Sequence, residues 1–212
     1  GRSDLRALVM AGEGGHFCAG GDIAEYPDFR FDEAALRDFH EREVWGGLSA
    51  LLACDLPVIA QIEGNCMGAG MEIASCCDIR VAGASARFGA PIARLGFPMA
   101  PREAQLVARE AGLLTAREML LQAAVLDASV MAARGFLHAV VSDADVATEV
   151  SQRARRMVSL SPQAARLNKR ALRALWPSAP PADLLDQAYR YADSPEHHEG
   201  IAAFNQKRAP VF

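Results

Sequence analysis

The chain has 212 residues, of which 51% are hydrophobic and 23% are charged, a balance typical of one globular domain of ordinary size. The formal net charge is −4, from 22 basic and 26 acidic side chains. A mildly acidic surface argues against nucleic acid as a partner, because phosphate binding needs a basic patch. No apolar run is long enough for a membrane-spanning helix, so we expect no membrane partner either.

In the first half of the chain, short apolar runs alternate with helical patterns. The run at 7–11 ends in glycines, which indicates a strand followed by a turn. Residues 33–53 have leucines near helical spacing and predict one long helix. Together the patterns predict strands at 7–11, 57–62, 79–82 and 86–89, a turn at 63–65 and a helix at 71–77.

From residue 101 onward the chain is rich in alanine, leucine and arginine at helical spacing. Ser161 and Ser194 each precede a proline, which is typical of a helix cap followed by the first helical residue. We predict helices near 102–111, 115–122, 128–134, 145–159, 162–175, 183–192 and 196–207, and one more strand at 138–141. Strands alternating with helices, followed mainly by helices, predict an α/β core at residues 1–135 and a helical C-terminal region at 136–212.

The five cysteines are odd in number and have no Cys-x-x-Cys spacing. We therefore expect neither a disulfide framework nor a metal site, and interpret these side chains as small buried apolar groups. Unpaired cysteines favour a reducing, cytoplasmic location. The residues concerned are Cys18, Cys54, Cys66, Cys76 and Cys77.

Two loops of small residues follow the first two predicted strands. They are residues 17–23 (FCAGGDI) and 64–72 (GNCMGAGME). Small side chains let a ligand approach the backbone, so that main-chain N–H groups can point at it. The second loop leads into a helix, whose first N–H groups lack internal partners and attract negative charge.

Glu72 follows Ala69 by about one helical turn, so both residues lie on the same side of the chain. A carboxylate beside an N–H that can hold an oxyanion suits enolate or acyl chemistry. The alternative is structural, because a Glu in a first helical turn also stabilises the helix dipole. The glycine spacing matches neither the dinucleotide-binding fingerprint nor a P-loop.

These segments resemble the crotonase (enoyl-CoA hydratase/isomerase) superfamily. The resemblance covers HFCAGGDI, GNCMGAGMEIASCCDIRVAG, ARFGAPIARLGFPMAP and SPEHHEGIAAFNQKRAPVF, and runs from about Ala7 to Phe212. It implies an α/β fold, a crotonase-like spiral of ββα units with a helical C-terminal trimerisation region. It also implies a homotrimer or hexamer, and an enzyme of fatty acid metabolism that takes an acyl-CoA thioester as substrate. No metal or redox cofactor is implied.

The resemblance also assigns roles to individual residues. The backbone N–H groups of Gly21 and Ala69 would form the oxyanion hole, and Glu72 would be the catalytic acid/base. Met71 and Ile92 would line the substrate pocket. Further residues match positions that contact CoA in relatives, the last two from a neighbouring subunit: Ala19, Asp22, Ile23, Phe204 and Lys207.

Two departures from the family pattern affect the predicted reaction. Hydratases of the family use a second glutamate directly after the FG-x-P tetrapeptide, where this chain has Ile92. The predicted function is therefore an enoyl-CoA hydratase-like lyase or isomerase, with two alternatives. These are an acyl-CoA decarboxylase or C–C lyase on the same scaffold, and an acyl-CoA-binding protein without turnover. Relatives also carry several tens of residues before the strand at Ala7, so the N-terminal part of the spiral core is expected to be missing here.

Overall fold

A computed structural model describes residues 4–175 and 182–211 of the chain. The strands are β1 Leu8–Ala11, β2 Val58–Ile62, β3 Asn65–Met67, β4 Ile79–Gly83, β5 Arg87–Gly89, β6 Val125–Asp127 and β7 Ala139–Val141. The α-helices are α1 Glu33–Asp38, α2 Trp45–Ala53, α3 Ala69–Cys76, α4 Pro101–Ala111, α5 Leu113–Leu121, α6 Ala128–Ala133, α7 Val146–Val158, α8 Pro162–Arg173, α9 Ala182–Gln187 and α10 Pro195–Asn205. Short 3₁₀ segments cover Ile23–Asp28 (η1), Pro91–Leu95 (η3) and Asp143–Asp145 (η4).

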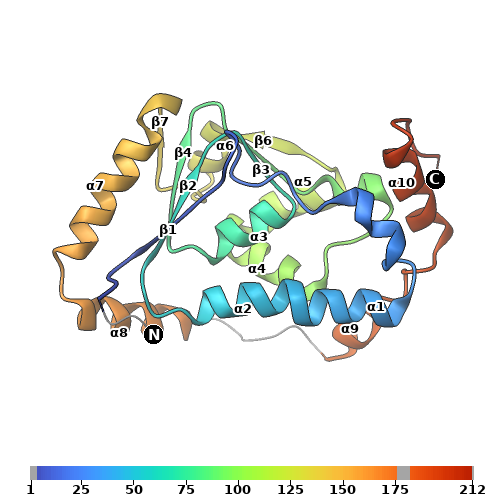
Figure 1. Cartoon of the computed structure of the whole chain (residues 1–212), viewed down its shortest axis with the longest axis horizontal. Coiled ribbons are helices and arrows are strands. Elements are labelled where there is room, and N and C mark those ends of the chain that lie inside the picture. The colour runs from blue at the N-terminus through green and yellow to red at the C-terminus, as the bar shows by residue number, and fades with distance from the viewer. Residues whose placement is uncertain (1–3, 176–181, 212) are drawn as a thin grey trace.

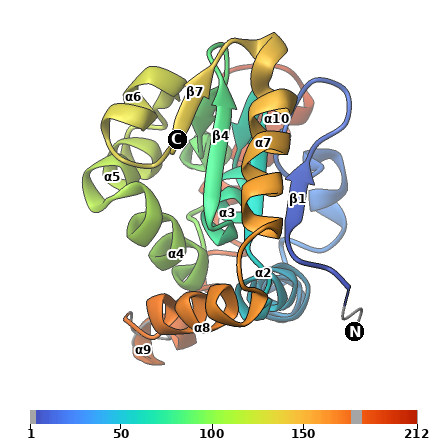
Figure 2. The same ribbon diagram turned by 90° about the vertical axis from the view of Figure 1, so that its left-hand side faces the viewer.

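The main sheet has four parallel strands in the order β1-β2-β4-β7, with helices on both of its faces (Figures 1 and 2). Ile59 of β2 packs against Val146 and Val150 of α7. Val58 and Ile62 point the other way, into the larger core that α3 to α6 cover. This burial on both faces explains why the strand has a continuous apolar run rather than an alternating one. β7 pairs with β4 in this sheet and α7 packs on it, although both elements come after the domain boundary expected at residue 135.

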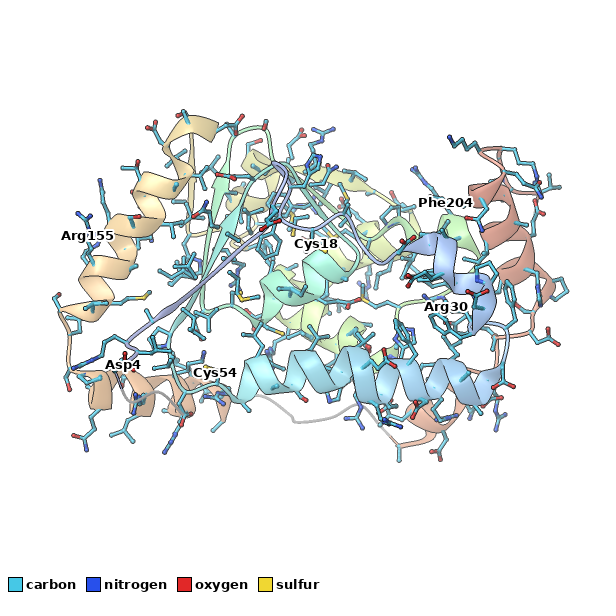
Figure 3. All side chains as sticks on the ribbon, in the orientation of Figure 1. Asp4, Cys18, Arg30, Cys54, Arg155 and Phe204 are labelled. Atoms are coloured by element: carbon cyan, nitrogen blue, oxygen red, sulfur yellow. The ribbon has the colours of Figure 1, made fainter. Side chains whose placement is uncertain are left out.

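A second, smaller sheet contains β3, β5 and β6. The sequence predicted a turn at 63–65 and no strand at β3 or β6, because runs of three residues are too short to show a period. Cys18, in the first small-residue loop, makes a parallel bridge with Cys66 of β3. Figure 3 shows Cys18 near the middle of the molecule, beside α3. The bridge links the two glycine-rich loops that the sequence analysis singled out.

The long helix predicted over 33–53 is present as one helical run, but its middle is a π-helical segment, Phe39–Val44 (η2). Such segments are rare and are frequent at functional sites. The predicted caps at Ser161 and Ser194 are confirmed, since each side chain accepts a hydrogen bond from a backbone N–H in the first helical turn. No helix in the described parts of the chain combines the length and the apolar character needed to cross a membrane.

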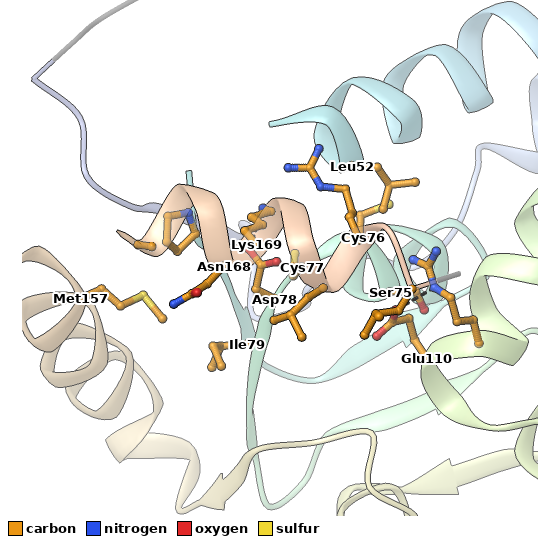
Figure 4. Close-up of a pocket in the computed structure, with 16 residues that line it drawn as sticks. Leu52, Ser75, Cys76, Cys77, Asp78, Ile79, Glu110, Met157, Asn168 and Lys169 are labelled. Carbon is orange, nitrogen blue, oxygen red and sulfur yellow. Dashed lines mark hydrogen bonds and ion pairs between the residues drawn. The ribbon is translucent and has the colours of Figure 1, made fainter. Parts of the chain in front are cut away.

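A partly buried ion pair holds α8 against the sheet. Lys169 Nζ lies 2.6 Å from Asp78 Oδ2 and 2.8 Å from the carbonyl oxygen of Leu56. The same carboxylate oxygen accepts the backbone N–H of Val58 at 2.7 Å. Figure 4 shows Lys169 and Asp78 at a hollow of about 380 Å³ between α8 and the start of β4. The polar atoms of this pair already have partners, so we interpret it as structural.

We expect Asp78→Asn to lower the free energy of unfolding by about 2 to 3 kcal/mol, because it leaves the Lys169 charge buried without a counterion. The double variant Asp78→Asn/Lys169→Met has no buried charge and should recover most of this loss. Urea unfolding at pH 7 measures both. The matched control is Arg170→Met, which removes an ion pair to Asp55 at the surface. A loss for Asp78→Asn no larger than the control's would contradict this interpretation.

Candidate active site

A cavity of about 480 Å³ lies where the two glycine-rich loops meet. Its walls come from residues 19–24, the start of α3, the π-helical segment and the stretch from Pro91 to Ala100. Phe204 of α10, labelled in Figure 3, also lines it. Apolar side chains dominate the lining, which is typical of a small-molecule site.

Backbone hydrogen bonds hold the two loops together. Cys18 N–H donates to the carbonyl of Asn65 at 3.0 Å, and Met67 N–H donates to the carbonyl of Cys18 at 2.9 Å. Gly68 N–H donates to the carbonyl of Gly89 in β5 at 2.9 Å. The first loop is therefore aligned with β3 and with the start of α3, which follows directly. This alignment brings Gly21 and Ala69 to one wall of the cavity.

Glycines permit this close approach of the two loops. Gly68 caps α3 with a φ of 51°, a left-handed conformation that side chains disfavour. A Cβ on Gly70 would lie 2.9 Å from the carbonyl oxygen of Cys18, and a Cβ on Gly21 would lie 2.4 Å from Tyr26 Oη. The glycines in these loops are therefore needed because a larger side chain would collide with neighbouring atoms, and not only because the turns need their backbone conformation.

The N–H groups of Gly21 and Ala69 donate to no group among the described residues. Ala69 is the first residue of α3, so its N–H belongs to the helix end that attracts negative charge. Both residues line the cavity. Two main-chain donors without a protein partner in the described part of the chain therefore belong to residues of the cavity lining, and groups of this kind stabilise oxyanions in enzymes.

Glu72 lies in the first turn of α3, on the same wall of the cavity. Burial raises the pKa of its carboxyl group to about 8, and the nearby Glu103 carboxylate adds to this rise. The Arg30 guanidinium acts in the opposite direction. Glu72 is therefore mostly protonated at neutral pH, and its neutral carboxyl group has both a donor and an acceptor oxygen.

A buried polar chain stands beside Glu72. Arg30 Nη2 donates to His40 Nε2 at 3.0 Å, and His40 Nδ1 lies 3.3 Å from Glu103 Oε1. A guanidinium can only donate, so Nε2 accepts and the proton of the neutral imidazole is on Nδ1, facing Glu103. Arg30 and His40 line the cavity, whereas Glu103 lies behind His40.

Sequence reasoning did not place these three residues at the site. They come from the loop after η1, from the π-helical segment and from α4, and only tertiary packing brings them together. A weak signal existed in Glu103, an acidic residue at the start of a helix that follows the expected position of the second glutamate. No sequence pattern indicated that His40 would lie at the site.

The predicted site residues fall into two groups. Gly21, Ala69 and Glu72 line the cavity together with the predicted neighbours Ala19, Asp22, Ile23, Ile92 and Phe204. Two residues lie elsewhere. Met71 is fully buried in the main core and does not line this cavity, because it faces the core from a different side of α3 than Glu72. Lys207 is exposed beyond the end of α10, so its contact with CoA stays a prediction.

Among the described residues, no three His, Cys, Asp or Glu side chains come close enough together to hold a metal ion. The polar side chains that line the cavity include Asp22, Arg30, His40 and Glu72. Carboxyl groups and hydrogen-bond donors are the kinds of group that transfer protons and stabilise charge.

Comparison with known proteins identifies the family of the chain. The family model described as enoyl-CoA hydratase/isomerase matches residues 2–212. A probable enoyl-CoA hydratase of Mycobacterium bovis is 32% identical over 99% of this chain and 80% of its own length. The 2,3-dehydroadipyl-CoA hydratase of Escherichia coli is 33% identical over 99% of this chain and 82% of its own.

Among solved structures, a methylmalonyl-CoA decarboxylase in complex with 2-nitronate-propionyl-CoA superimposes with a TM-score of 0.88. It is 25% identical and covers all of this chain, which spans 82% of that one. The predicted crotonase-like fold is thereby confirmed. A whole-length family match, relatives above 30% identity and a shared fold lead to one conclusion: the chain belongs to the enoyl-CoA hydratase/isomerase family.

Proposed function

We propose that this protein is an acyl-CoA enzyme in which the N–H groups of Gly21 and Ala69 hold the thioester oxygen as an enolate. The observation that carries the proposal is the pair of amides on adjoining loops that have no partner within residues 4–175 and 182–211, with a neutral carboxyl group one helical turn beyond the second. The amides stabilise charge that develops on the oxygen, and Glu72 moves the proton.

Hydration of an enoyl-CoA is the leading reaction. Water adds to the β-carbon, the electron pair of the double bond moves to the thioester oxygen, and the α-carbon of the resulting enolate takes a proton. The neutral carboxyl of Glu72 can give that proton from one oxygen while the other accepts a proton from the attacking water. One residue then does the work of two, which is consistent with Ile92 in the place of the second family glutamate.

Decarboxylation or C–C cleavage of an acyl-CoA is the second candidate. The similarity to a methylmalonyl-CoA decarboxylase favours it, as does the apolar Ile92, which packs with Tyr26 and Phe97. Loss of CO₂ leaves the same enolate, and Glu72 would protonate its α-carbon. A panel of enoyl-, methylmalonyl- and 3-hydroxyacyl-CoA thioesters separates the two reactions. Tight binding without any product would instead indicate an acyl-CoA-binding protein.

We also propose a homotrimer or hexamer. Leucines with more than half of their surface exposed gather on α5 and α8, and apolar patches of this kind mark interfaces between subunits. They are Leu113, Leu114, Leu121, Leu167 and Leu172. In such an assembly Phe204 and Lys207 would contact the CoA bound near a neighbouring subunit.

The variant Glu72→Gln should lose about 10²- to 10⁴-fold in kcat/KM on the best thioester of the panel, because the amide can no longer transfer a proton. For the wild type, kcat/KM should fall as the pH rises through about 8, where Glu72 loses its proton. Steady-state kinetics between pH 6 and pH 9.5 measure both. A rise through this range would contradict the neutral-acid role, and equal rates for the two proteins would remove Glu72 from the mechanism.

A stability measurement controls for misfolding of this variant. The pKa of Glu72 is raised from 4.5 to about 8, so between these values the folded state keeps a proton that the unfolded state releases. The wild type therefore loses stability as the pH rises through this window. The side chain introduced by Glu72→Gln does not titrate. The free energy of unfolding of this variant, relative to the wild type, should therefore increase from pH 5 to pH 8.

Replacing Gly21 by Ala should displace its N–H, because the new Cβ would lie 2.4 Å from Tyr26 Oη. We expect a loss of about 10²- to 10³-fold in kcat/KM, the usual effect of removing one oxyanion donor. Adding Tyr26→Phe removes the clashing hydroxyl and should restore part of the rate.

The matched control is Gly46→Ala on α2, where a Cβ meets nothing within 4 Å. It should leave kcat/KM unchanged and stabilise the helix by about 0.5 to 1 kcal/mol. If Gly21→Ala behaved like this control, Gly21 would not belong to the oxyanion hole.

A further inference from the structure

Arg30 is the most deeply buried charge on the cavity wall. Its side chain is 1% exposed, and its guanidinium carbon lies 4.1 Å from the ring centre of Tyr26 and 4.2 Å from that of Phe97. Figure 3 labels Arg30 at the end of the molecule that holds α1 and α10. The two rings fix the plane of the guanidinium and exclude water from its faces.

This guanidinium has no counterion among the described residues. No carboxylate oxygen there lies within 4.0 Å of it, and its hydrogen-bond partners carry no negative charge: His40 and the hydroxyl groups of Tyr26 and Tyr191. Its Nε is buried without any partner in the described part of the chain. Buried charges in proteins are normally paired, so an unpaired one facing a cavity needs an explanation.

Arg80 shows how the same fold satisfies a buried guanidinium. It is 5% exposed, and its Nε donates to the carbonyl of Phe136 at 2.7 Å. Its Nη1 donates to the carbonyl of Cys77 at 2.6 Å, and its Nη2 pairs with Glu110 at 3.3 Å. Arg80 lies outside the cavity. The difference between the two arginines is that only Arg30 faces space that a ligand can fill.

We infer that Arg30 binds a carboxylate at the far end of the acyl chain, so that the substrate is the CoA thioester of a dicarboxylic acid. The inference rests on the proposed function and names its substrate class. A planar guanidinium with free N–H groups matches a carboxylate in geometry and charge, and such charge-assisted pairs are among the stronger hydrogen bonds.

The acyl end of the thioester is the part that reaches Arg30. The cavity has a mostly apolar lining, which suits an acyl chain better than the charged nucleotide end of CoA. Arg30 also acts electrostatically on Glu72, which places it on the side of the reacting carbons.

The carboxylate is retained through the reaction. Loss of CO₂ requires the carboxylate charge to move onto the thioester, and a guanidinium bound to that carboxylate opposes this movement. Arg30 is therefore better suited to bind a carboxylate that is distant from the α-carbon than one that leaves as CO₂. His40, hydrogen-bonded between Arg30 and Glu103, acts as a positioning residue for the guanidinium.

Saturated thioesters test the inference without any turnover. Isothermal titration of the full chain compares glutaryl- and adipoyl-CoA with pentanoyl- and hexanoyl-CoA, pairs that differ only in the end group. The wild type should bind the carboxylated members about 10- to 100-fold more tightly. Arg30→Met should abolish this preference, because it weakens binding of adipoyl-CoA far more than binding of hexanoyl-CoA. The control Arg102→Met, on α4 and outside the cavity, should keep the preference.

The outcomes separate this inference from the proposed function. Binding of hexanoyl-CoA without any preference for adipoyl-CoA overturns the inference and leaves the proposed function standing. Absence of binding for every thioester overturns both. If Arg30→Met weakened binding of methylmalonyl-CoA and not of adipoyl-CoA, Arg30 would bind a carboxylate on the α-carbon. This result would overturn the inference that the carboxylate lies at the far end of the acyl chain. If Arg30→Met does not fold, the preference of the wild type alone decides.

Discussion

The parallel bridge between Cys18 and Cys66 is the constraint on which the site depends. Without it, the loop after β1 and the loop before α3 would be two unrelated glycine-rich turns. With it, the amides of Gly21 and Ala69 lie in one cavity wall, and the carboxyl group of Glu72 follows on the same helix. The bridge is made of backbone hydrogen bonds, so side-chain variation at the two cysteines does not remove it. What it requires is small residues around it, as the Gly70 contact with Cys18 shows.

Charge around the cavity is arranged so that Glu72 stays neutral. Burial and the Glu103 carboxylate raise its pKa, while Arg30 acts against them. Glu103 is linked to Arg30 through the neutral His40, so a positive and a negative group are held apart by an imidazole. A substrate carboxylate on Arg30 would offset the one charge that favours ionised Glu72. Substrate recognition and the protonation state of the acid are then coupled through a single side chain.

Much of the fold could be predicted from the sequence, because the four strands of the main sheet and most helices have apolar patterns of sufficient length. β3 and β6 could not, since three residues show no period and their pairing depends on distant partners. The glycine loops and Glu72 were found because they lie close together in the chain. Arg30, His40 and Glu103 were not, because their contacts join the loop after η1 to the π-helical segment and α4. Met71 was assigned to the substrate pocket from its place beside Glu72, but neighbouring residues on a helix face different sides.

The carbonyl stretching frequency of a bound thioester tests the central claim most directly. An acyl-CoA with a ¹³C-labelled thioester carbonyl would be measured by difference infrared spectroscopy, free and bound to the protein. Two N–H donors that polarise the carbonyl should lower its frequency relative to water. Glu72→Gln should show the same lowering, because the donors belong to the backbone of Gly21 and Ala69. A bound carbonyl with the frequency it has in water would contradict the account.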